Sequence, residues 1–423
     1  MWEKLQRAWA IKPLRRDILF VLGMLFVFRL AAHIPVPGIN AVNLRNFLAG
    51  NQILGLLNVF SGGTIQNFSL IMLGVGPYIT ASIIFQLLTM VVPSLEELSK
   101  EGESGQQKIN MYTRLATVPL ALLQAFGFIK LLSTSQQAIF PYLSTVRFAS
   151  IMLTVTAGTI FLMWIGELIT EKKIGNGISL LIFSGIVASL PSALQNAVVN
   201  YNPSDLYTYI FFGLITIATI VGVVVMSEGQ RNIPVSYAKQ VRGGKSYGGT
   251  QSHLPLRINM AGVIPIIFAI SIILFPPMIA QFFVNYAGWL GTLSHNVIAL
   301  FQNQLFYAVL YFLLVFGFTF FYTAVVFQPQ KIAENLQNQG GFIPGIRPGK
   351  QTEEYLSKTM NRLILIGALF LAVLAILPLA LRAFTGTQAL AIGGTSLLIV
   401  VSVAIETAKQ IESQLTMYEY DRV

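Results

Sequence analysis

The sequence predicts an all-α polytopic membrane protein with ten transmembrane helices. Of its 423 residues, 54% are hydrophobic and only 10% are charged, whereas soluble domains carry about 25% charged residues. Apolar segments that approach the roughly 20 residues needed to cross a bilayer recur along the whole chain. Because a chain with so few charges cannot cover itself with polar surface in water, a lipid bilayer is its expected solvent.

The candidate spans are the apolar stretches that lie between polar segments. In chain order they cover residues 17–34, 69–92, 113–133, 149–170, 177–196, 206–227, 257–280, 304–327, 359–381 and 388–408. In the second span, Pro77 follows Gly76 and suits the first turn of a helix, where its missing N–H is not needed. The fifth span is short and is interrupted by Gly185 and Pro191.

The basic residues indicate how these spans are oriented. Of the 27 Lys and Arg residues, 22 lie in or beside the two termini and the loops on the same side of the membrane. The five on the opposite side are Arg29, Arg45, Lys130, Arg147 and Arg382. Since cytoplasmic loops are enriched in Lys and Arg, this asymmetry predicts cytoplasmic termini and an even number of spans. It also accounts for the net charge of +10, so no DNA partner is expected.

The segment 54–66, between the first two spans, is apolar but too short to cross a bilayer. Gly62 and Gly63 provide a hinge within it, because glycine tolerates most backbone angles. Two interpretations are open at this point. The segment is either a re-entrant or interfacial helix, or a mobile plug over a pore.

Two long charged loops, 228–256 and 328–358, lie on the predicted cytoplasmic side. The alternating residues of the first loop suit a β-hairpin. Its sequence Gly244-Lys245-Ser246 lacks the glycine that a phosphate-binding loop requires five residues earlier, so nucleotide binding is rejected. In the second loop, Arg347 stands between two Pro-Gly turns that would present it outward, either as a docking contact or as a solvated charge.

Several classes of chemistry are excluded or disfavoured. There is no cysteine, and the three histidines are far apart, so no metal site, disulfide or catalytic thiol is expected. Intramembrane charge is limited to Arg29, Glu167 and Glu406, of which the two glutamates are close enough to the cytoplasmic end to pair or reach the interface. The chain has no catalytic motif for an intramembrane enzyme and no proton relay. Composition alone still leaves a channel and a small-solute transporter comparable.

Five long motifs distinguish these alternatives. They are FSGGTIQNFSLIMLGVGPYITASIIFQLL, GELITEKKIGNGISLLIF, HLPLRINMAGVIPIIFA, FIPGIRPGKQT and GGTSLLIVVSVAIET. In order and spacing they resemble SecY, the family of channel-forming subunits of the bacterial protein translocase. The resemblance covers essentially the whole chain.

The resemblance implies two pseudo-symmetric five-helix halves, residues 1–200 and 201–423, around a central pore. A ring of branched apolar side chains would narrow this pore, since water and ions enter such a ring reluctantly. By motif the ring residues are Val75, Ile79, Ile178, Ile182, Ile267 and Ile399. Residues 54–66 fall where the family places its plug, whose residues would be Leu57, Asn58, Val59, Phe60, Ser61, Gly62, Gly63 and Thr64.

The resemblance also implies a lateral gate between spans two and three and spans seven and eight. Gln86, Gln124 and Asn259 would make polar contacts at this gate. The two cytoplasmic loops would dock the ribosome and the SecA ATPase. The docking residues would be Arg231, Lys239, Arg242 and Arg347.

The implied function is a passive channel of the bacterial cytoplasmic membrane. It would translocate unfolded secretory polypeptides with signal sequences and release membrane-protein segments sideways into lipid. No catalytic residue and no cofactor are expected in this chain, because the energy would come from SecA, from ribosomal synthesis or from the proton-motive force. The implied partners are SecE and SecG subunits, SecA, the ribosome, the translocated polypeptide and membrane lipids.

Overall fold

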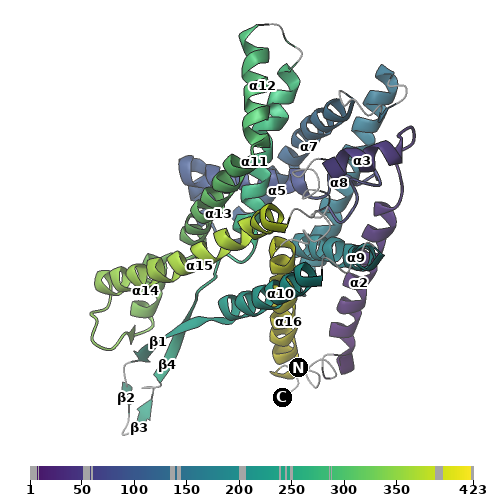
Figure 1. The fold of residues 1–423 in the computed structure, drawn as a ribbon. Coiled ribbons are helices and arrows are strands. Elements are labelled where there is room, and N and C mark those ends of the chain that lie inside the picture. The colour runs from purple at the N-terminus through teal and green to yellow at the C-terminus, as the bar shows by residue number, and fades with distance from the viewer. Residues whose placement is uncertain are drawn as a thin grey trace.

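The computed structural model describes residues 7, 9–50, 58, 61–133, 139–140, 144–199, 206–237, 240–242, 245–247, 251–284, 286, 288–385 and 394–420. Within these ranges the chain is mostly helical (Figure 1). The helices are α2 (Lys12–Ala32), α3 (Ala41–Gly50), α5 (Gly76–Val91), α6 (Pro93–Lys100), α7 (Glu103–Ser133), α8 (Thr145–Glu171), α9 (Gly177–Val199), α10 (Leu206–Glu228), α11 (Ile264–Phe283), α12 (Trp289–Gln302), α13 (Gln304–Val326), α14 (Pro329–Asn338), α15 (Lys350–Thr385) and α16 (Gly394–Tyr420). The strands are β1 (Gln230–Tyr237), β2 (Gln240–Arg242), β3 (Lys245–Tyr247), β4 (Gln251–Arg257) and β5 (Gly341–Phe342).

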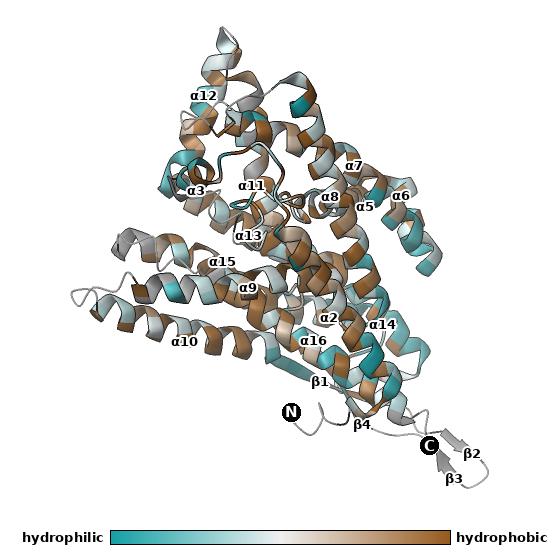
Figure 2. Ribbon diagram, turned by 90° about the vertical axis from the view of Figure 1, so that its right-hand side faces the viewer, coloured by the Kyte–Doolittle hydropathy of each residue, from teal (hydrophilic) through white to brown (hydrophobic). Residues whose placement is uncertain are grey.

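Each of the ten predicted spans overlaps one of these helices. By length and composition, five helices in the described ranges can cross a membrane: α7, α8, α10, α13 with its continuation into α14, and α15. A sixth span results if α5 and α6, bent by 100° at their junction, are counted together. The chain is therefore a multi-pass membrane protein, and apolar residues line the helices through the middle of the molecule while hydrophilic residues gather at α6, α14 and the end of α16 (Figure 2).

Local sequence explains where several helices begin and end. The Ser144 hydroxyl accepts a hydrogen bond from the Arg147 backbone N–H at 3.3 Å and caps α8. The Asn303 side chain accepts from the backbone of Leu305 at 3.0 Å and caps α13. The bend after α5 occurs at Val92, which precedes Pro93 and is extended with ψ 111°, because proline disfavours helical angles in the residue before it.

Three large apolar cores, and a smaller cluster near the two termini, hold the described helices together. One core lies entirely within the first half of the chain and includes Leu44, Met72 and Val155. A second lies entirely within the second half and includes Ile233 and Leu356. The third and largest core combines residues from both halves. This core is where the two halves of the sequence meet.

The two long loops are joined by a sheet at one end of the molecule. β1 pairs antiparallel with β4 over Gln230–Ser236, which confirms the predicted hairpin in the first loop. β1 also pairs with β5 from the second loop, placing Ser236 opposite Phe342. The start of α2 and the end of α16 lie at this same end, where Leu14 packs against Leu415 (Figure 1).

Three features differ from the sequence predictions. The predicted span 69–92 is helical only from Gly76, because residues 69–75 form turns and Gly74 has φ +58°, which a helix cannot continue. The uncharged connection after α11 contains the helix α12, and the loop 328–358 contains α14, neither of which was predicted. The predicted span 359–381 begins earlier, since α15 starts at Lys350.

Candidate functional site

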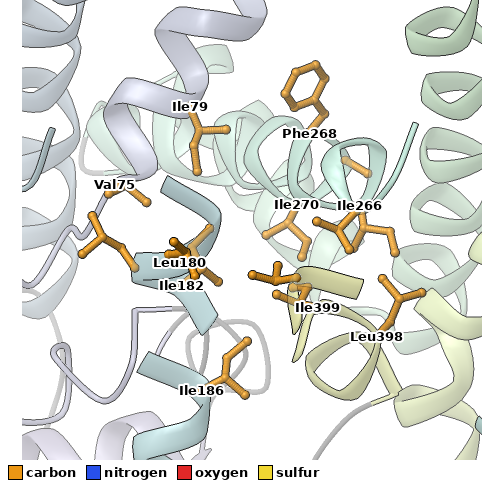
Figure 3. Close-up of a cluster of buried hydrophobic side chains, with 14 of the residues drawn as sticks. Val75, Ile79, Leu180, Ile182, Ile186, Ile266, Phe268, Ile270, Leu398 and Ile399 are labelled. Carbon is orange, nitrogen blue, oxygen red and sulfur yellow. The ribbon is translucent and has the colours of Figure 1, made fainter. Parts of the chain in front are cut away.

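The six predicted ring residues meet in the core that the two halves share. They come from α5, α9, α11 and α16, and side chains of these four helices converge in Figure 3. Val75, Ile79, Ile182 and Ile399 are buried, while Ile178 and Ile267 are partly buried against the same core. We call these six side chains the ring cluster. Ile186, Ile266 and Ile270 lie beside them in the same core, although the motifs did not single them out.

A polar cavity of about 560 Å³ adjoins the ring cluster. Ile79, Ile178 and Ile267 form part of its wall, so the ring cluster closes one side of the cavity. The remaining wall mixes apolar residues such as Ile264 and Phe268 with the polar residues Ser82, Gln86, Glu103, Asn110, Arg114, Glu167, Thr170, Glu171, Asn176 and Ser179. Water and an extended polar chain could occupy such a cavity, whereas the ring cluster offers them no hydrogen-bonding partner.

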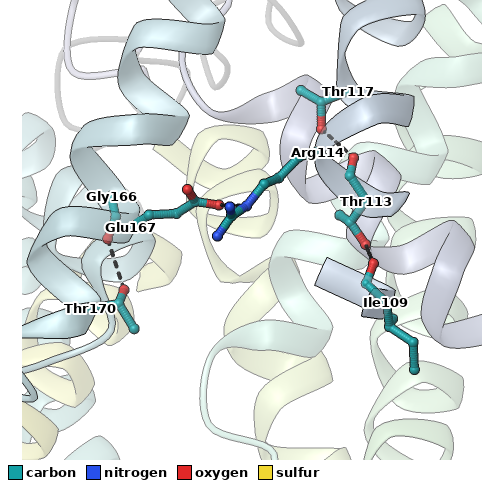
Figure 4. Close-up of polar contacts among 7 residues, drawn as sticks. All are labelled: Ile109, Thr113, Arg114, Thr117, Gly166, Glu167 and Thr170. Carbon is teal, nitrogen blue, oxygen red and sulfur yellow. Dashed lines mark hydrogen bonds and ion pairs between the residues drawn. The ribbon is translucent and has the colours of Figure 1, made fainter. Parts of the chain in front are cut away.

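Two of the lining residues form an ion pair in the wall of this cavity. Arg114 of α7 pairs with Glu167 of α8 (Figure 4), as predicted for a glutamate near the membrane surface. Neighbouring threonines satisfy their hydroxyls within their own helices, as in the bond from Thr117 to the Thr113 carbonyl at 2.8 Å. The ion pair joins two helices of the first half beside the ring cluster.

We call residues 58–66, which lie within the predicted plug, the plug loop, and its described residues, Asn58 and 61–66, are joined by hydrogen bonds. Leu57, Val59 and Phe60 lie outside the described residues, and residues 61–66 form turns, not a helix. The Asn58 side chain accepts from the Gln66 backbone N–H at 3.0 Å and donates to the Gln66 side chain at 3.1 Å. The Gly63 N–H donates to the Asn58 carbonyl at 2.8 Å. The buried Thr64 donates to the Met72 carbonyl at 3.4 Å, which ties the loop to the chain that leads into α5.

The plug loop rests on two helices. A guanidinium nitrogen of Arg29, on α2, donates to the Gly62 carbonyl at 3.0 Å. Gly62 also meets the backbone of Gly185 on α9 so closely that neither position has room for a Cβ. Gly62 has φ +72°, which favours glycine.

The three predicted gate residues lie on α5, on α7 and just before α11, and α11 contacts both α5 and α7. Gln124 of α7 donates to the Thr80 hydroxyl of α5 at 3.4 Å. Asn259 donates to the Gly262 carbonyl at 3.4 Å, just before α11. Gln86 lines the polar cavity, and its side-chain oxygen is buried without a hydrogen-bond partner.

The predicted docking residues are distributed over the two loops. Arg231 is exposed on β1, and Arg242 is in β2. Lys239 lies outside the described residues. Arg347 is exposed, and its carbonyl accepts a hydrogen bond from the Thr352 hydroxyl at 2.9 Å. Gly345 and Gly349, with φ +81° and +94°, make the turns on either side of it.

Sequence reasoning missed the two residues that support Gly62. Arg29 was recognised as an intramembrane charge, but no partner could be assigned because Gly62 is 33 residues away. A glycine inside a membrane helix such as Gly185 signals close packing, yet it does not say against what. In the described ranges no group of three or more His, Asp or Glu residues could hold a metal ion.

Comparisons with known proteins show the family of the chain. A family model described as SecY matches residues 69–408. The chain is 43% identical to the protein translocase subunit SecY of Streptomyces galbus, over 98% of both chains. It is 44% identical to the SecY of Halalkalibacterium halodurans, over 99% of both chains.

Two solved structures share the fold. One is described as a protein conducting channel, with a TM-score of 0.63 and 18% identity over 93% of this chain and 91% of that chain. The other is Sec61 in the canine ribosome-channel complex, with a TM-score of 0.61 and 18% identity over 94% of this chain and 91% of that chain. At such low identity these two likenesses bear on the fold alone.

Proposed function

The chain belongs to the SecY family, and from this premise we propose that it forms a protein-conducting channel. The channel would pass unfolded secretory polypeptides with signal sequences across the bacterial cytoplasmic membrane. The observation that carries the proposal is the ring cluster, six buried or partly buried aliphatic side chains that lie where the two halves of the chain meet and form part of the wall of the cavity beside them.

The ring cluster suits a channel that is closed at rest and opens around a polypeptide. Branched apolar side chains form a constriction that water and ions enter reluctantly. They make no directional bonds to a passing chain, so they do not select its sequence. The polar cavity would receive the polypeptide on the cytoplasmic side, and the plug loop would add a second seal beyond the ring.

The arrangement of the two halves, residues 1–200 and 201–423, supports a lateral gate. α5 and α7 would form one side of this gate, and α11 and α13 the other. In this proposal the contacts of α11 with α5 and α7 would be the ones that keep the gate closed. Opening would let apolar segments of a membrane protein reach lipid.

The sheet that joins the two loops supports a docking surface for the partners of the channel. The ribosome and the SecA ATPase would bind there, through Arg231, Lys239, Arg242 and Arg347. Both termini would share this cytoplasmic side. SecE and SecG would complete the complex, and the exposed apolar side chains of α10, including Leu214 and Ile217, would face membrane lipids or these subunits. The chain itself would perform no catalysis, and the polypeptide would be driven by SecA, by the ribosome or by the proton-motive force.

Single-channel conductance tests this proposal. The chain, in complex with its SecE partner, is incorporated into planar bilayers and compared with a variant that lacks residues 58–66. We expect the intact channel to be nearly silent and the deletion variant to conduct ions. If neither conducts and vesicles instead accumulate a radiolabelled small solute, the chain is a transporter and the proposal is wrong.

A further inference from the structure

We propose that Arg29 and Gly185 are the residues that hold the plug loop closed, so that removing either one releases it. This inference rests on the proposed function of residues 58–66 as a plug. It adds two positioning residues, on α2 and α9, that lie outside the plug loop and were not assigned to it by the motifs.

The first of the two contacts that keep the plug loop in place is the hydrogen bond from Arg29. Its guanidinium lies at the last turn of α2 and is half-buried, and it donates to the Gly62 carbonyl at 3.0 Å. Hydrogen bonds from charged donors are roughly twice as strong as neutral ones. A half-buried guanidinium that loses this partner can replace it only with water on its exposed side, so part of its hydrogen-bonding capacity is lost. The closed position of the plug loop is therefore the one in which Arg29 is satisfied.

The close backbone contact between Gly62 and Gly185 lets the plug loop fit directly against α9. A Cβ added to Gly185 would lie 2.8 Å from the Cα of Gly62, closer than side-chain carbons come to backbone. Gly62 is buried in this contact. Any larger residue at position 185 would push the plug loop away, and the Arg29 bond would lengthen with it.

Gly185 lies on the same helix as two residues of the ring cluster, so its contact with Gly62 is linked to the position of the ring cluster. Gly185 is on α9, three residues after Ile182 and directly before Ile186, which lies in the same apolar core. Arg29 is on α2, which contributes none of the six ring side chains. Movement of α9 during widening of the ring would therefore withdraw Gly185 from Gly62. The plug loop would lose one support each time the ring opens.

The test is single-channel conductance of the complex with four single changes. Arg29→Gln and Gly185→Ala are expected to raise the fraction of time that the channel conducts by about ten- to a hundredfold, given the strength of a charge-assisted hydrogen bond. Gly213→Ala is the matched control for Gly185→Ala, because a Cβ at Gly213, in α10, meets nothing within 4 Å. Deletion of residues 58–66 is the positive control.

The same two substitutions are then combined with the deletion. Without a plug loop they should add no further conductance, since they have nothing left to hold. Added conductance in the deleted background would mean that they disturb helix packing, and would overturn the proposal. If the deletion conducts but neither substitution does, the plug stands and its hold by Arg29 and Gly185 is wrong. If the deletion itself stays silent, the plug function fails and this inference fails with it.

A second measurement does not depend on conductance. The chain has no cysteine, so Ser61→Cys introduces a single thiol next to Gly62. Arg29→Gln should raise the rate at which a membrane-impermeant reagent labels this thiol from the outer side, by the same factor as it raises conductance. An unchanged rate in a variant that remains monodisperse by size exclusion would contradict release of the plug loop.

Discussion

The ring cluster and the plug loop are proposed to close the same pore, but they are held in different ways. The ring cluster consists of six aliphatic side chains from four helices, packed by apolar contact alone. The plug loop is a short turn fixed by hydrogen bonds at Asn58, Gly62 and Gly63 and by one backbone contact.

From this difference we infer how each of the two seals, the ring cluster and the plug loop, would open. Apolar contacts are non-directional and depend on area, so the ring cluster can widen by degrees and close around chains of any sequence. Hydrogen bonds and close backbone contacts are lost over a small displacement, so the plug loop should leave its place as a unit. The ring cluster is therefore expected to tolerate changes of shape but not of polarity, whereas the plug loop should be sensitive to single polar atoms.

The largest effect is expected from making the ring cluster polar. Replacing Ile182 and Ile399 together by serine removes two buried isoleucine side chains, about 3 kcal/mol of apolar burial. Water would then enter the constriction, and resting ion conductance should rise by about a hundredfold. Planar-bilayer recordings measure this rise.

The control for this prediction changes shape without polarity. Ile182→Leu with Ile399→Leu conserves volume, and each exchange should cost less than about 1.5 kcal/mol of stability, with resting conductance close to that of the intact channel. A leak as large as that of the serine variant would show that precise packing, and not apolar character, forms the seal.

A smaller effect is expected when the plug loop loses its internal bonds. Asn58→Leu removes both side-chain bonds to Gln66, which are exposed and together contribute about 1 kcal/mol. The plug loop should then open about fivefold more often, as seen in conductance and in labelling of Ser61→Cys. Asn296→Leu, the same exchange on the exposed surface of α12, is the control. An equal rise in this control would remove the distinction between the two seals.

The two seals also differ in how far the sequence predicts them. The span helices follow from apolar runs, and the hairpin of β1 and β4 follows from alternation. The ring cluster required motifs, because isoleucine in a membrane helix faces lipid as often as protein and composition cannot tell these apart. Once the motifs are used, all six predicted residues are found in one core.

The hold on the plug loop could not be predicted because it depends on distant contacts. Nothing in the sequence pairs Gly62 with Gly185, and the turns of residues 61–66 are fixed by side-chain bonds that a hydropathy pattern does not contain. Helix α12 was missed for a related reason. Its 14 residues are uncharged and too few to cross a bilayer, so a search for membrane spans does not select them.

The smallest effect on either seal is expected from Arg347, which lies in the docking loop and touches neither. Its side chain is exposed between two turns, so Arg347→Ala should leave stability and resting conductance unchanged. If the sheet of β1, β4 and β5 presents Arg347 to a SecA-type motor, ATP-driven uptake of a radiolabelled secretory precursor into vesicles should fall by at least about tenfold, the value of one charge-assisted contact.

Lys350→Ala, three residues further on and also exposed, removes the same charge and should have a much weaker effect. Equal losses in both variants would mean that the motor responds to the net charge of the loop, and that the rigid turns around Arg347 do not matter. A rise in resting conductance would mean that the docking loop and the seals are coupled even without a partner, and the separation drawn between opening and docking would be wrong.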